Sequence, residues 1–515
     1  MLTLTAMLAR TIRLYGERPA IVDVERQFTW SEFSNRIAHC AGLLSNRGIN
    51  RGDRFGILSR NSFRQAELMH AGYWLGAIPV PVNYRLAASE IKAIFKDANC
   101  GLIAVEEFFD DFVADGCLDH LSDQIVWIPS GGKQQGASDY EEELQAARPA
   151  PMREASEDDD ALLLYTGGTT GQSKGVRLSH RNIVANAFQL SFLVRPHHSD
   201  IYLHIPPMFH SADLLGTTHT IAGGAHAYLP QFTPEIALST IESLRATHAM
   251  LTPTMIIMTL QDTALARTDL SSFRQLLYGS SPMAAEWIQK ALSGFRDVEI
   301  IQAYGLTETS PILTILPMAE HQEAMAGENP SLLQSVGRPI PGVEMRIVDD
   351  NAVDVPIDAA GEIIVRGANV SKGYLNRPDE NRVSFREGWL HTGDIGRMNN
   401  EGYLFLLDRK KDMIITGGEN VYSSEVEACL YQHPDVHECA VVGVPDETYG
   451  EALLAVVVTT PGAVLTDAML IAHCRDRIGG YKIPRLYQFV DELPKSAMNK
   501  ILKNELRRIF SPHNS

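Results

Sequence analysis

One polar, glycine-rich stretch dominates the first third of the sequence: Tyr165-Thr166-Gly167-Gly168-Thr169-Thr170-Gly171-Gln172-Ser173-Lys174-Gly175. It directly follows a short apolar run, 161–164, which we expect to be a strand. The four glycines let backbone N–H groups approach a ligand closely, and the threonine hydroxyls and the Lys174 ammonium add further donors. This combination indicates a polyphosphate-binding loop. It is not a Walker loop, because Ser173 stands where G-x-x-x-x-G-K-[ST] needs its second glycine.

A polar hairpin turn without any ligand would have a similar composition, because short glycine motifs recur by chance. Four more motifs follow the loop, namely Tyr304-Gly305-Leu306-Thr307-Glu308-Thr309, Gly388-Trp389-Leu390-His391-Thr392-Gly393-Asp394, Asp408-Arg409-Lys410-Lys411-Asp412 and Pro494-Lys495-Ser496-Ala497-Met498-Asn499-Lys500. With these five motifs in this order, the sequence resembles the adenylate-forming superfamily: acyl- and aryl-CoA ligases, firefly luciferase and peptide-synthetase adenylation domains. The motifs span most of the chain, so the resemblance is very specific.

Three positions depart from the family pattern. The family loop usually reads Y-T-S-G-T-T-G-x-P-K-G, so Gly167 and Ser173 differ from it. Gly167 removes one hydroxyl, which would loosen the loop's hold on phosphate without abolishing it. Asn499 occupies the usual glycine before Lys500, where some aryl-acid ligases resemble this sequence.

Length and charge limit the possible folds and partners. A chain of 515 residues is too long for one compact core, so we expect at least two domains. The formal charge of −18 argues against nucleic acid or an anionic membrane surface as the main partner. No apolar run approaches the roughly 20 residues of a membrane-spanning helix, so we expect no transmembrane segment.

Cysteine and histidine spacing bears on compartment and metals. The six cysteines are far apart with no C-x-x-C, and residues 1–15 lack a signal-peptide core, so we expect reduced, mostly buried thiols in a cytoplasmic protein. The seventeen histidines show no H-E-x-x-H or similar spacing, which argues against a zinc site. The oligomeric state is not readable, and a homodimer is a reasonable default.

Short β-like runs alternate with helical patterns from residue 19 onward, which predicts an α/β fold with a mostly parallel sheet. Thr29 with Glu32, and Ser424 with Glu427, are spaced as capping boxes. Residues 131–160 are polar and acidic and read as a connecting segment, and residues 335–407 read as β-rich.

The expected architecture is therefore a large N-terminal domain of α/β subdomains plus a β-rich subdomain, with a small C-terminal α+β domain. The family resemblance implies that residues 1–408 bind ATP and the acid, that residues 409–412 form a hinge at Lys411, and that residues 413–515 form the mobile domain.

The resemblance also implies an ATP site. The residues that would contact ATP or AMP are Thr166, Gly167, Gly168, Thr169, Thr170, Gly171, Lys174, Gly279, Ser280, Ser281, Tyr304, Gly305, Thr307, Asp394 and Arg409. Asp394 and Arg409 would hold the ribose and Tyr304 would stack on adenine. Glu308 would bind Mg²⁺, a hard cation that prefers carboxylate and phosphate oxygens. Tight-turn chemistry also explains Asp394, and a strand-end aromatic such as Tyr304 is usually a core residue.

Catalysis is expected from Lys500, His210 and Glu308. By resemblance, Lys500 is the mobile lysine that bridges the carboxylate and the α-phosphate, a task that suits a compact cation on a long stem. His210 matches the family's gate near the substrate carboxylate, although a histidine after an apolar strand is equally well a satisfied core residue. The predicted acyl pocket comprises His210, Ser211, Ala212, Gly279, Gly305 and Thr309.

A thiol must attack the acyl-adenylate in a second step. By resemblance, the C-terminal domain rotates about Lys411, so that Lys500 serves the first step and Gly417 and Gly418 line a pantetheine tunnel in the second. Tyr449 matches a position that can contact CoA.

The sequence thus predicts an ATP-dependent carboxylic acid–CoA ligase that works through an acyl-adenylate, with ATP, Mg²⁺ and coenzyme A required. An aryl or arylalkenoic acid and a medium-chain fatty acid remain rival substrates, and Asn499 favours the aryl acid slightly. An amine, a carrier protein or oxygen could instead accept the acyl group. A non-catalytic binding protein is disfavoured, because such a protein needs no mobile lysine.

Overall fold

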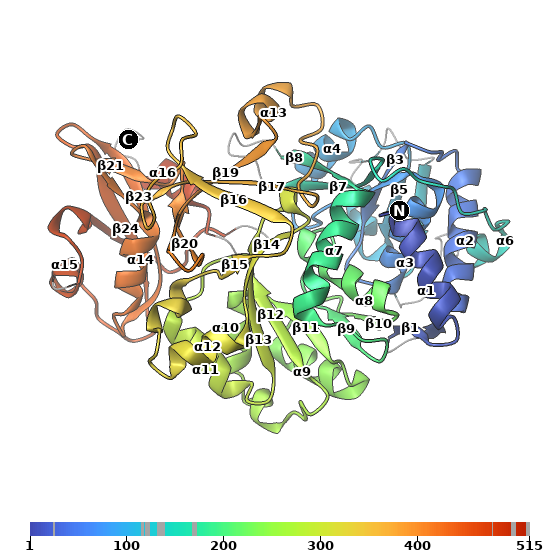
Figure 1. Cartoon of the computed structure of the whole chain (residues 1–515), viewed down its shortest axis with the longest axis horizontal. Helices are drawn as coiled ribbons and strands as arrows, with labels where there is room; N and C mark the ends of the chain where they lie inside the picture. Colours follow the sequence, from blue (N-terminus) through green and yellow to red (C-terminus); the bar gives the residue numbers. More distant parts are fainter. Residues whose placement is uncertain are drawn as a thin grey trace.

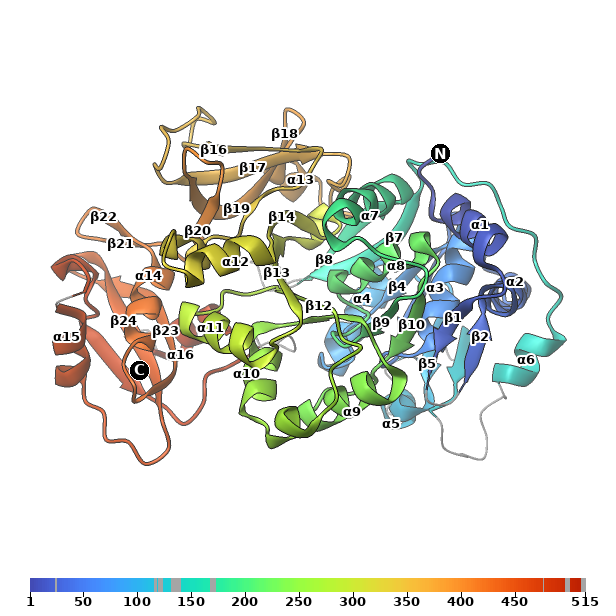
Figure 2. The same cartoon turned by 60° about the horizontal axis from the view of Figure 1, so that its bottom comes forward.

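The computed structural model describes residues 1–23, 26–114, 118, 124–130, 140–166, 173–475, 477–495 and 501–510. The fold is α/β, with a large N-terminal domain and a small C-terminal domain, as predicted. Figures 1 and 2 both place the C-terminal strands at one end of the molecule and the parallel sheet of residues 54–128 at the other. None of the described helices is long and apolar enough to cross a membrane.

A nine-stranded sheet forms the centre of the large domain, in the order β15-β14-β13-β12-β11-β9-β10-β1-β2. Strands β1, β10, β9, β11, β12 and β13 run parallel, and β2, β14 and β15 are antiparallel to their neighbours at the two edges. Their bounds are β1 Pro19–Val22, β2 Gln27–Thr29, β9 Ile201–His204, β10 Ala225–Tyr228, β11 His248–Leu251, β12 Gln275–Gly279, β13 Glu299–Gly305, β14 Ile312–Leu316 and β15 Arg338–Pro339.

A second sheet, β4-β3-β5-β6, is parallel throughout. Its bounds are β3 Arg54–Leu58, β4 Ile78–Pro81, β5 Ile103–Glu106 and β6 Ile125–Ile128. These strands confirm the predicted alternation of short β-like runs with helices, because buried parallel strands are short apolar runs bounded by turn residues. The helices between them are α3 Phe63–Leu75 and α4 Ala88–Asp97.

The N-terminal segment packs α1 (Leu4–Tyr15) and α2 (Trp30–Asn46) against this part of the molecule. The predicted capping box of α2 is confirmed: the Thr29 hydroxyl accepts from the Glu32 N–H at 3.2 Å, and the Glu32 carboxylate accepts from the Thr29 N–H at 2.8 Å. The described part of the predicted connecting segment, residues 140–160, differs from that prediction at its start, because Tyr140 and Leu144 bury one face of helix α6 (Tyr140–Ala146).

The β-rich region is confirmed as an antiparallel sheet with β16 Val343–Val348, β17 Gly361–Gly367, β18 Phe385–Arg386, β19 Trp389–Met398 and β20 Leu404–Arg409. The C-terminal domain has β21 Ile414–Thr416, β22 Glu419–Val421, β23 Val436–Asp446, β24 Gly450–Thr459 and β25 Leu486–Phe489. Its helices are α14 Ser423–Tyr431, α15 Asp467–Arg475 and α16 Lys503–Phe510.

The predicted capping box of Ser424 and Glu427 is wrong. Helix α14 begins at Ser423 and its N-cap, Tyr422, makes no side-chain cap. The Ser424 hydroxyl donates to the Leu407 carbonyl, and the Glu427 carboxylate accepts from the Val441 N–H at 2.8 Å. Tertiary partners therefore take both side chains away from the helix terminus.

The thiols are described for five of the six cysteines, and all five are free and buried, as expected. Cys117 lies outside the described residues. The two sulfurs of Cys429 and Cys474, which are distant in the sequence, lie 3.8 Å apart across α14 and α15.

Candidate active site

The carboxyl ends of β12 and β13 lie side by side, because Gly279 of β12 is in register with Ala303 of β13. Two predicted walls of the pocket therefore meet at one edge of the parallel sheet, the edge where ligands bind in open α/β sheets. Ser280 and Ser310 follow these strands with φ of +74° and +68°. Non-glycine residues rarely adopt such angles, and strained backbone of this kind clusters at functional sites.

The glycines at these strand ends are needed for backbone packing. A Cβ at Gly279 would lie 2.1 Å from the Ala303 carbonyl oxygen, and a Cβ at Gly305 would lie 1.9 Å from the Pro311 oxygen. Real Cβ atoms do not approach backbone this closely. Close packing against neighbouring backbone therefore explains why both positions are glycine. This explanation does not depend on any ligand that binds at this edge of the sheet.

Asp394 is held by two side chains that the sequence places far from each other. Its Oδ1 lies 2.7 Å from Arg409 Nε, and its Oδ2 accepts a 2.7 Å hydrogen bond from the Tyr304 hydroxyl. Asp394 and Arg409 are also in register across β19 and β20. The carboxylate is buried, and its charge raises the pKa of the Arg409 guanidinium. Each carboxylate oxygen has a second lone pair, so the group can still accept bonds from vicinal hydroxyls.

Tyr304 is a core residue, the alternative that the sequence left open for it. Its ring packs in a cluster with Leu313, Val365 and Leu404, and only 9% of the residue is exposed. Burial, and then the Asp394 charge, raises the pKa of its phenol, so the hydroxyl remains a donor. Its predicted stacking on adenine stays a prediction.

Glu308 and Lys174 are linked by Tyr374, a residue that sequence reasoning missed. The Tyr374 hydroxyl donates to Glu308 Oε1 at 2.8 Å, and Lys174 Nζ lies 5.3 Å from the centre of the Tyr374 ring. Burial and the Glu308 charge raise the pKa of the Tyr374 phenol. No motif marks Tyr374, because tertiary pairing of its segment with β8, at Val176, brings it to the site.

The phosphate-loop stretch lies in the β7–β8 hairpin, Asp160–Thr166 and Lys174–Ser179, in which Thr166 is in register with Lys174. The two described ends of the predicted loop are therefore brought together. Lys500 lies outside the described part of the chain. So do the remaining predicted loop residues, which are Gly167, Gly168, Thr169, Thr170 and Gly171.

The predicted acid gate lies in the turn and short 3₁₀ helix after β9. His210 is the N-cap of η3 (Ser211–Leu215), and its Nδ1 accepts from the Ala212 N–H at 3.4 Å. The Thr307 hydroxyl donates to Ser211 Oγ at 3.2 Å, which joins η3 to η5 (Thr307–Thr309) after β13. The structure thus brings the gate and the Glu308 segment together, and Ser211, Ala212 and Thr309 are buried there.

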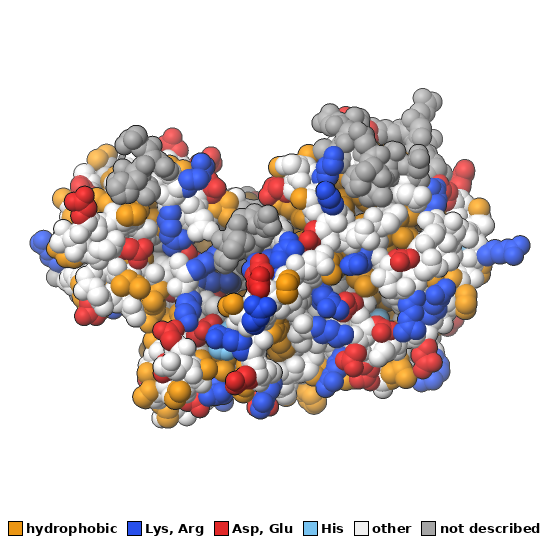
Figure 3. Space-filling view, turned by 90° about the horizontal axis from the view of Figure 1, so that it is seen from above, with side chains coloured by type: hydrophobic (Ala, Val, Ile, Leu, Met, Phe, Trp, Pro, Cys, Tyr) orange, Lys and Arg blue, Asp and Glu red, His pale blue; other side chains and the backbone are white. Residues whose placement is uncertain are grey.

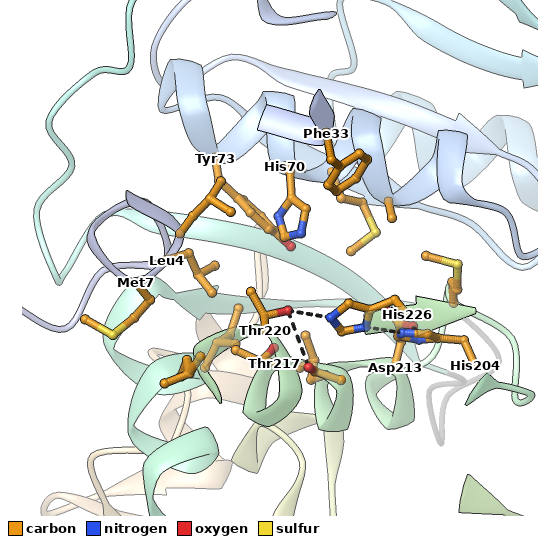
Figure 4. A pocket seen from close by; sticks show the side chains of 18 of the residues that line it. Leu4, Met7, Phe33, His70, Tyr73, His204, Asp213, Thr217, Thr220 and His226 are labelled. Atoms are coloured by element: carbon orange, nitrogen blue, oxygen red, sulfur yellow. Dashed lines mark hydrogen bonds and ion pairs between the residues drawn. The ribbon is translucent and has the colours of Figure 1, made fainter. Parts of the chain in front are cut away.

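A series of hydrogen-bonded side chains anchors η3 to the neighbouring elements (Figure 4). Asp213 Oδ1 lies 2.6 Å from His204 Nδ1, His204 Nε2 lies 3.0 Å from His226 Nδ1, and His226 Nε2 lies 3.0 Å from Thr220 Oγ1. These groups line a largely apolar cavity of about 60 Å³ between α1, α3 and α8 (Gly216–Ala222). No sequence pattern marks these four residues, which lie on β9, η3, α8 and β10.

The predicted hinge joins the ribose residues to the C-terminal domain. The Lys410 N–H donates to the Gly393 carbonyl at 2.8 Å, and Asp412 pairs with Arg507 of α16 at 2.9 Å. Lys411 stands between these two anchors, and partial burial lowers the pKa of its ammonium. Figure 3 shows the molecular surface hollowed between the two lobes, with Lys and Arg side chains around the hollow.

The predicted CoA residues are brought together in the C-terminal domain. Gly417 and Gly418 form the two-residue turn between β21 and β22, with φ of +60° and +85°. The Gly417 N–H donates to the Tyr449 carbonyl at 2.8 Å, and the Arg485 guanidinium lies 3.6 Å from the centre of the Tyr449 ring. Arg485 is a basic group beside this turn that the sequence analysis did not select.

Two family models match most of the chain. The AMP-binding enzyme model matches residues 8–375, and the AMP-binding enzyme C-terminal domain model matches residues 425–500.

The feruloyl-CoA synthase of an Amycolatopsis species is 35% identical over 97% of this chain and 98% of its own length. The indoleacetate–CoA ligase of Aromatoleum aromaticum is 34% identical over 96% of this chain and 95% of its own. The crystal structure of ATP-bound MatB from Rhodopseudomonas palustris matches with a TM-score of 0.89 at 29% identity, covering 99% of both chains.

Proposed function

Because the chain belongs to the AMP-binding enzymes, in the acyl- and aryl-CoA ligase branch of the adenylate-forming superfamily, we propose that it joins an aromatic carboxylic acid to coenzyme A through an acyl-adenylate. The family establishes an ATP-using ligase. The identity of the acid, the thiol acceptor and the role of each residue are the proposal.

The observation that carries the proposal is the Asp394 constellation. A buried carboxylate on β19 is fixed by Arg409 and Tyr304 at 2.7 Å each, and the neighbouring strand β20, which ends at Arg409, leads into the predicted hinge. Such a preorganised acceptor suits the two vicinal hydroxyls of a ribose. A binding site placed next to a hinge lets nucleotide binding influence the orientation of the C-terminal domain.

Charge neutralisation is the main chemical task of the first step, because a carboxylate must approach a polyphosphate. Glu308 offers a carboxylate oxygen beside Lys174 and the base of the phosphate hairpin, which fits a Mg²⁺ ion shared with phosphate oxygens. Bound Mg²⁺ would supply positive charge to the leaving pyrophosphate. Tyr374 holds the Glu308 carboxylate in place, and Lys174 contributes a second positive charge.

The residues near Lys411 support a two-step reaction. Lys500 would neutralise the carboxylate and the α-phosphate in the first step. Rotation about Lys411 would then bring the turn of Gly417 and Gly418 to the acyl-adenylate, where Arg485 and Tyr449 lie beside the incoming CoA. The thiol adds to the acyl carbon, the bond from that carbon to the phosphate oxygen breaks, and AMP leaves.

An aromatic acid is favoured over a medium-chain fatty acid by three facts together. Two relatives that align over nearly their whole length are named for aromatic acids. Asn499 resembles aryl-acid ligases at that position. The described gate residues are small and uncharged around His210, so they suit a flat ring that carries one carboxylate.

The proposal is tested with a panel of aryl, arylalkenoic and medium-chain fatty acids, each with MgATP and with or without CoA. Pyrophosphate release and thioester formation are followed separately. We expect an aryl acid to give continuous pyrophosphate release, matched by thioester, only when CoA is present.

Three other results would indicate a different acceptor, a different substrate or a non-catalytic role. Acid-dependent pyrophosphate release without thioester would replace CoA by an amine, a carrier protein or oxygen as the acceptor. Turnover of fatty acids alone would keep the ligase and overturn the aromatic substrate. Failure of every acid to release pyrophosphate, in a protein that binds ATP, would favour a non-catalytic role.

A further inference from the structure

Three buried side chains from separate elements meet at the edge of the central sheet opposite to the candidate active site. Asp200 directly precedes β9, His219 lies on α8, and His248 is the first residue of β11. Because β9 and β11 are parallel, their first residues lie away from the carboxyl ends where the ATP site is predicted. Asp200 and His219 are 1% exposed and His248 is 4% exposed.

The three side chains have the spacing of a metal-ligand group. One nitrogen of each histidine and one Asp200 carboxylate oxygen all lie within 4.8 Å of one another, the only such group among the residues that the structure describes. His248 Nδ1, which is 2.8 Å from the Thr247 hydroxyl, lies 3.8 Å from Asp200 Oδ2, and the two imidazole rings are 4.8 Å apart at 63°. Ligands of one zinc ion are roughly 3 to 4 Å apart, so a contraction of about 1 Å is needed.

His219 has a free coordination position within this group. Its Nε2 is buried and has no hydrogen-bond partner among the described residues, whereas its Nδ1 lies 3.1 Å from the Thr218 hydroxyl. An imidazole with one nitrogen anchored and the other unused is suited to bind a metal ion.

We propose that Asp200, His219 and His248 form a structural site for a divalent transition metal ion of the zinc type. Two imidazole nitrogens and one carboxylate oxygen suit Zn²⁺ or Co²⁺, whereas Mg²⁺ prefers oxygen ligands alone. The site differs from the Mg²⁺ site proposed at Glu308 in position and in ligand type. Sequence spacing could not reveal it, because the three ligands come from three separate elements.

Arg274 regulates the site by competing for Asp200. Its guanidinium pairs with Asp200 Oδ1, and its side chain is 52% exposed, so it can move into solvent when an ion binds. The other oxygen, Asp200 Oδ2, accepts from the His197 N–H at 2.7 Å, which keeps the carboxylate in position. Removal of the guanidinium charge should therefore tighten metal binding, whereas removal of an imidazole should weaken it.

A bound ion would tie α8 to β9 and β11. Helix α8 begins directly after η3, which carries the predicted acid gate. Metal binding would therefore stabilise the gate segment without contacting substrate. Its measurable signature is a metal-dependent rise in the unfolding temperature, since a ligand that binds only the folded state stabilises that state.

The test uses the full-length protein after chelator treatment, titrated with Co²⁺ and then Zn²⁺. Visible Co²⁺ absorption reports nitrogen and oxygen ligation, and zinc displaces it. We expect one ion per chain for the wild type, and at least about ten-fold weaker binding for His219→Gln and for His248→Gln. Arg274→Gln should bind more tightly than the wild type. His321→Gln is the matched control, because His321 is also buried but contacts Tyr278 instead.

Three results would overturn the proposal: no stoichiometric Co²⁺ or Zn²⁺ binding by the wild type and by Arg274→Gln, equal binding by His219→Gln, or weaker binding by Arg274→Gln. Circular dichroism of each chelated variant shows whether it folds without the ion. If His219→Gln or His248→Gln does not fold, the comparison of metal binding by Arg274→Gln and by the wild type tests the proposal alone.

Discussion

Asp394 combines two features that rarely occur together at a surface turn: it is buried, and both of its oxygens are fixed by protein donors. Burying a carboxylate without partners is costly, so Arg409 and Tyr304 are needed for it to remain charged. The same arrangement holds the charge ready for a ligand without further reorganisation. At the level of single residues, the candidate site thus acts by electrostatics. It is tested by substitutions that remove the charge of one side chain.

Asp394→Asn should raise the KM for ATP about 10- to 100-fold, because hydrogen bonds to a charged acceptor contribute about 1.5 to 3 kcal/mol. The measurement is steady-state kinetics with ATP varied at saturating acid and CoA. Asp358→Asn is the control, because Asp358 also pairs with an arginine of β19, Arg397, but lies at the surface. An unchanged KM for ATP in Asp394→Asn would remove Asp394 from the ribose site.

Lys500→Ala should lower the rate of adenylate formation about 100-fold or more, by analogy with loss of one charge-stabilising donor. Thioester formation from supplied acyl-adenylate should change little. Lys495→Ala, which removes a surface lysine paired with Glu438, is the control. Equal losses in both half-reactions would mean that Lys500 has no role specific to adenylation.

At the element scale, the short η3 helix depends on its neighbours for its position. A five-residue 3₁₀ helix has little stability of its own, and here Asp213 anchors it to β9 through His204 while Ser211 anchors it to the segment after β13. His226 and Thr220 extend the anchor to β10 and α8. The gate is therefore positioned by hydrogen bonds between elements.

His204→Phe should raise the KM for the acid several-fold more than it lowers kcat, because it frees η3 without touching the reacting atoms. His204→Gln, which keeps one donor, should restore part of the affinity. A double-mutant cycle with Asp213→Asn should be non-additive, since both changes break the same contact. Additive effects, or a fall in kcat with constant KM, would contradict the positioning role.

At the scale of the whole molecule, ion pairs connect the C-terminal domain to the predicted hinge. Asp412 pairs with Arg507 of α16, and Asp408 accepts from the Ser423 N–H and hydroxyl. Helix α16 directly follows the segment that contains Lys500. Movement at residues 409–412 would therefore move that segment and the turn of Gly417 and Gly418 together, as one body.

Lys411→Pro should slow one half-reaction at least ten-fold more than the other, because proline fixes φ near −65° and restricts the rotation. The two half-reactions are measured separately, as for Lys500→Ala. Lys411→Ala removes the charge but leaves the backbone free, so it should retain both rates. Unchanged rates for both steps in the proline variant would refute the hinge assignment.

The large domain should lose stability as the pH falls from about 6.5 toward 4. Burial lowers the pKa of His180 to about 4, below the ordinary value of 6.5. The unfolded chain therefore takes up a proton first, so the stabilisation present above pH 6.5 declines as the pH falls through this window. This histidine should cost about 1 to 2 kcal/mol between pH 6.5 and 5.

Chemical unfolding at pH 7.5 and pH 5, followed by tryptophan fluorescence, checks this prediction. All five tryptophans lie before residue 408, so the signal reports the large domain. His180→Asn should flatten the pH dependence, and the exposed His437→Asn should not. Equal unfolding free energies of the wild type at the two pH values would contradict the expected linkage.

Much of the fold could be predicted because its signals are local. The alternation of strands and helices and the β-rich region of residues 335–407 follow from short apolar runs, and the Thr29 and Glu32 cap follows from residues three apart. The capping prediction for Ser424 and Glu427 failed although the spacing was the same. Their side chains contact Leu407 and Val441 instead, because the C-terminal domain offers them tertiary partners.

The family, the order of the motifs and the α/β class could be inferred from the residues alone, because these depend on residue types at fixed spacing along the chain. Folding in three dimensions was needed to show that Tyr374 links Glu308 to Lys174, that His204 and His226 support the gate, and that Asp200 meets His219 and His248. Those contacts join residues from different strands and helices. Their distances are set by sheet order and register, which no local pattern encodes.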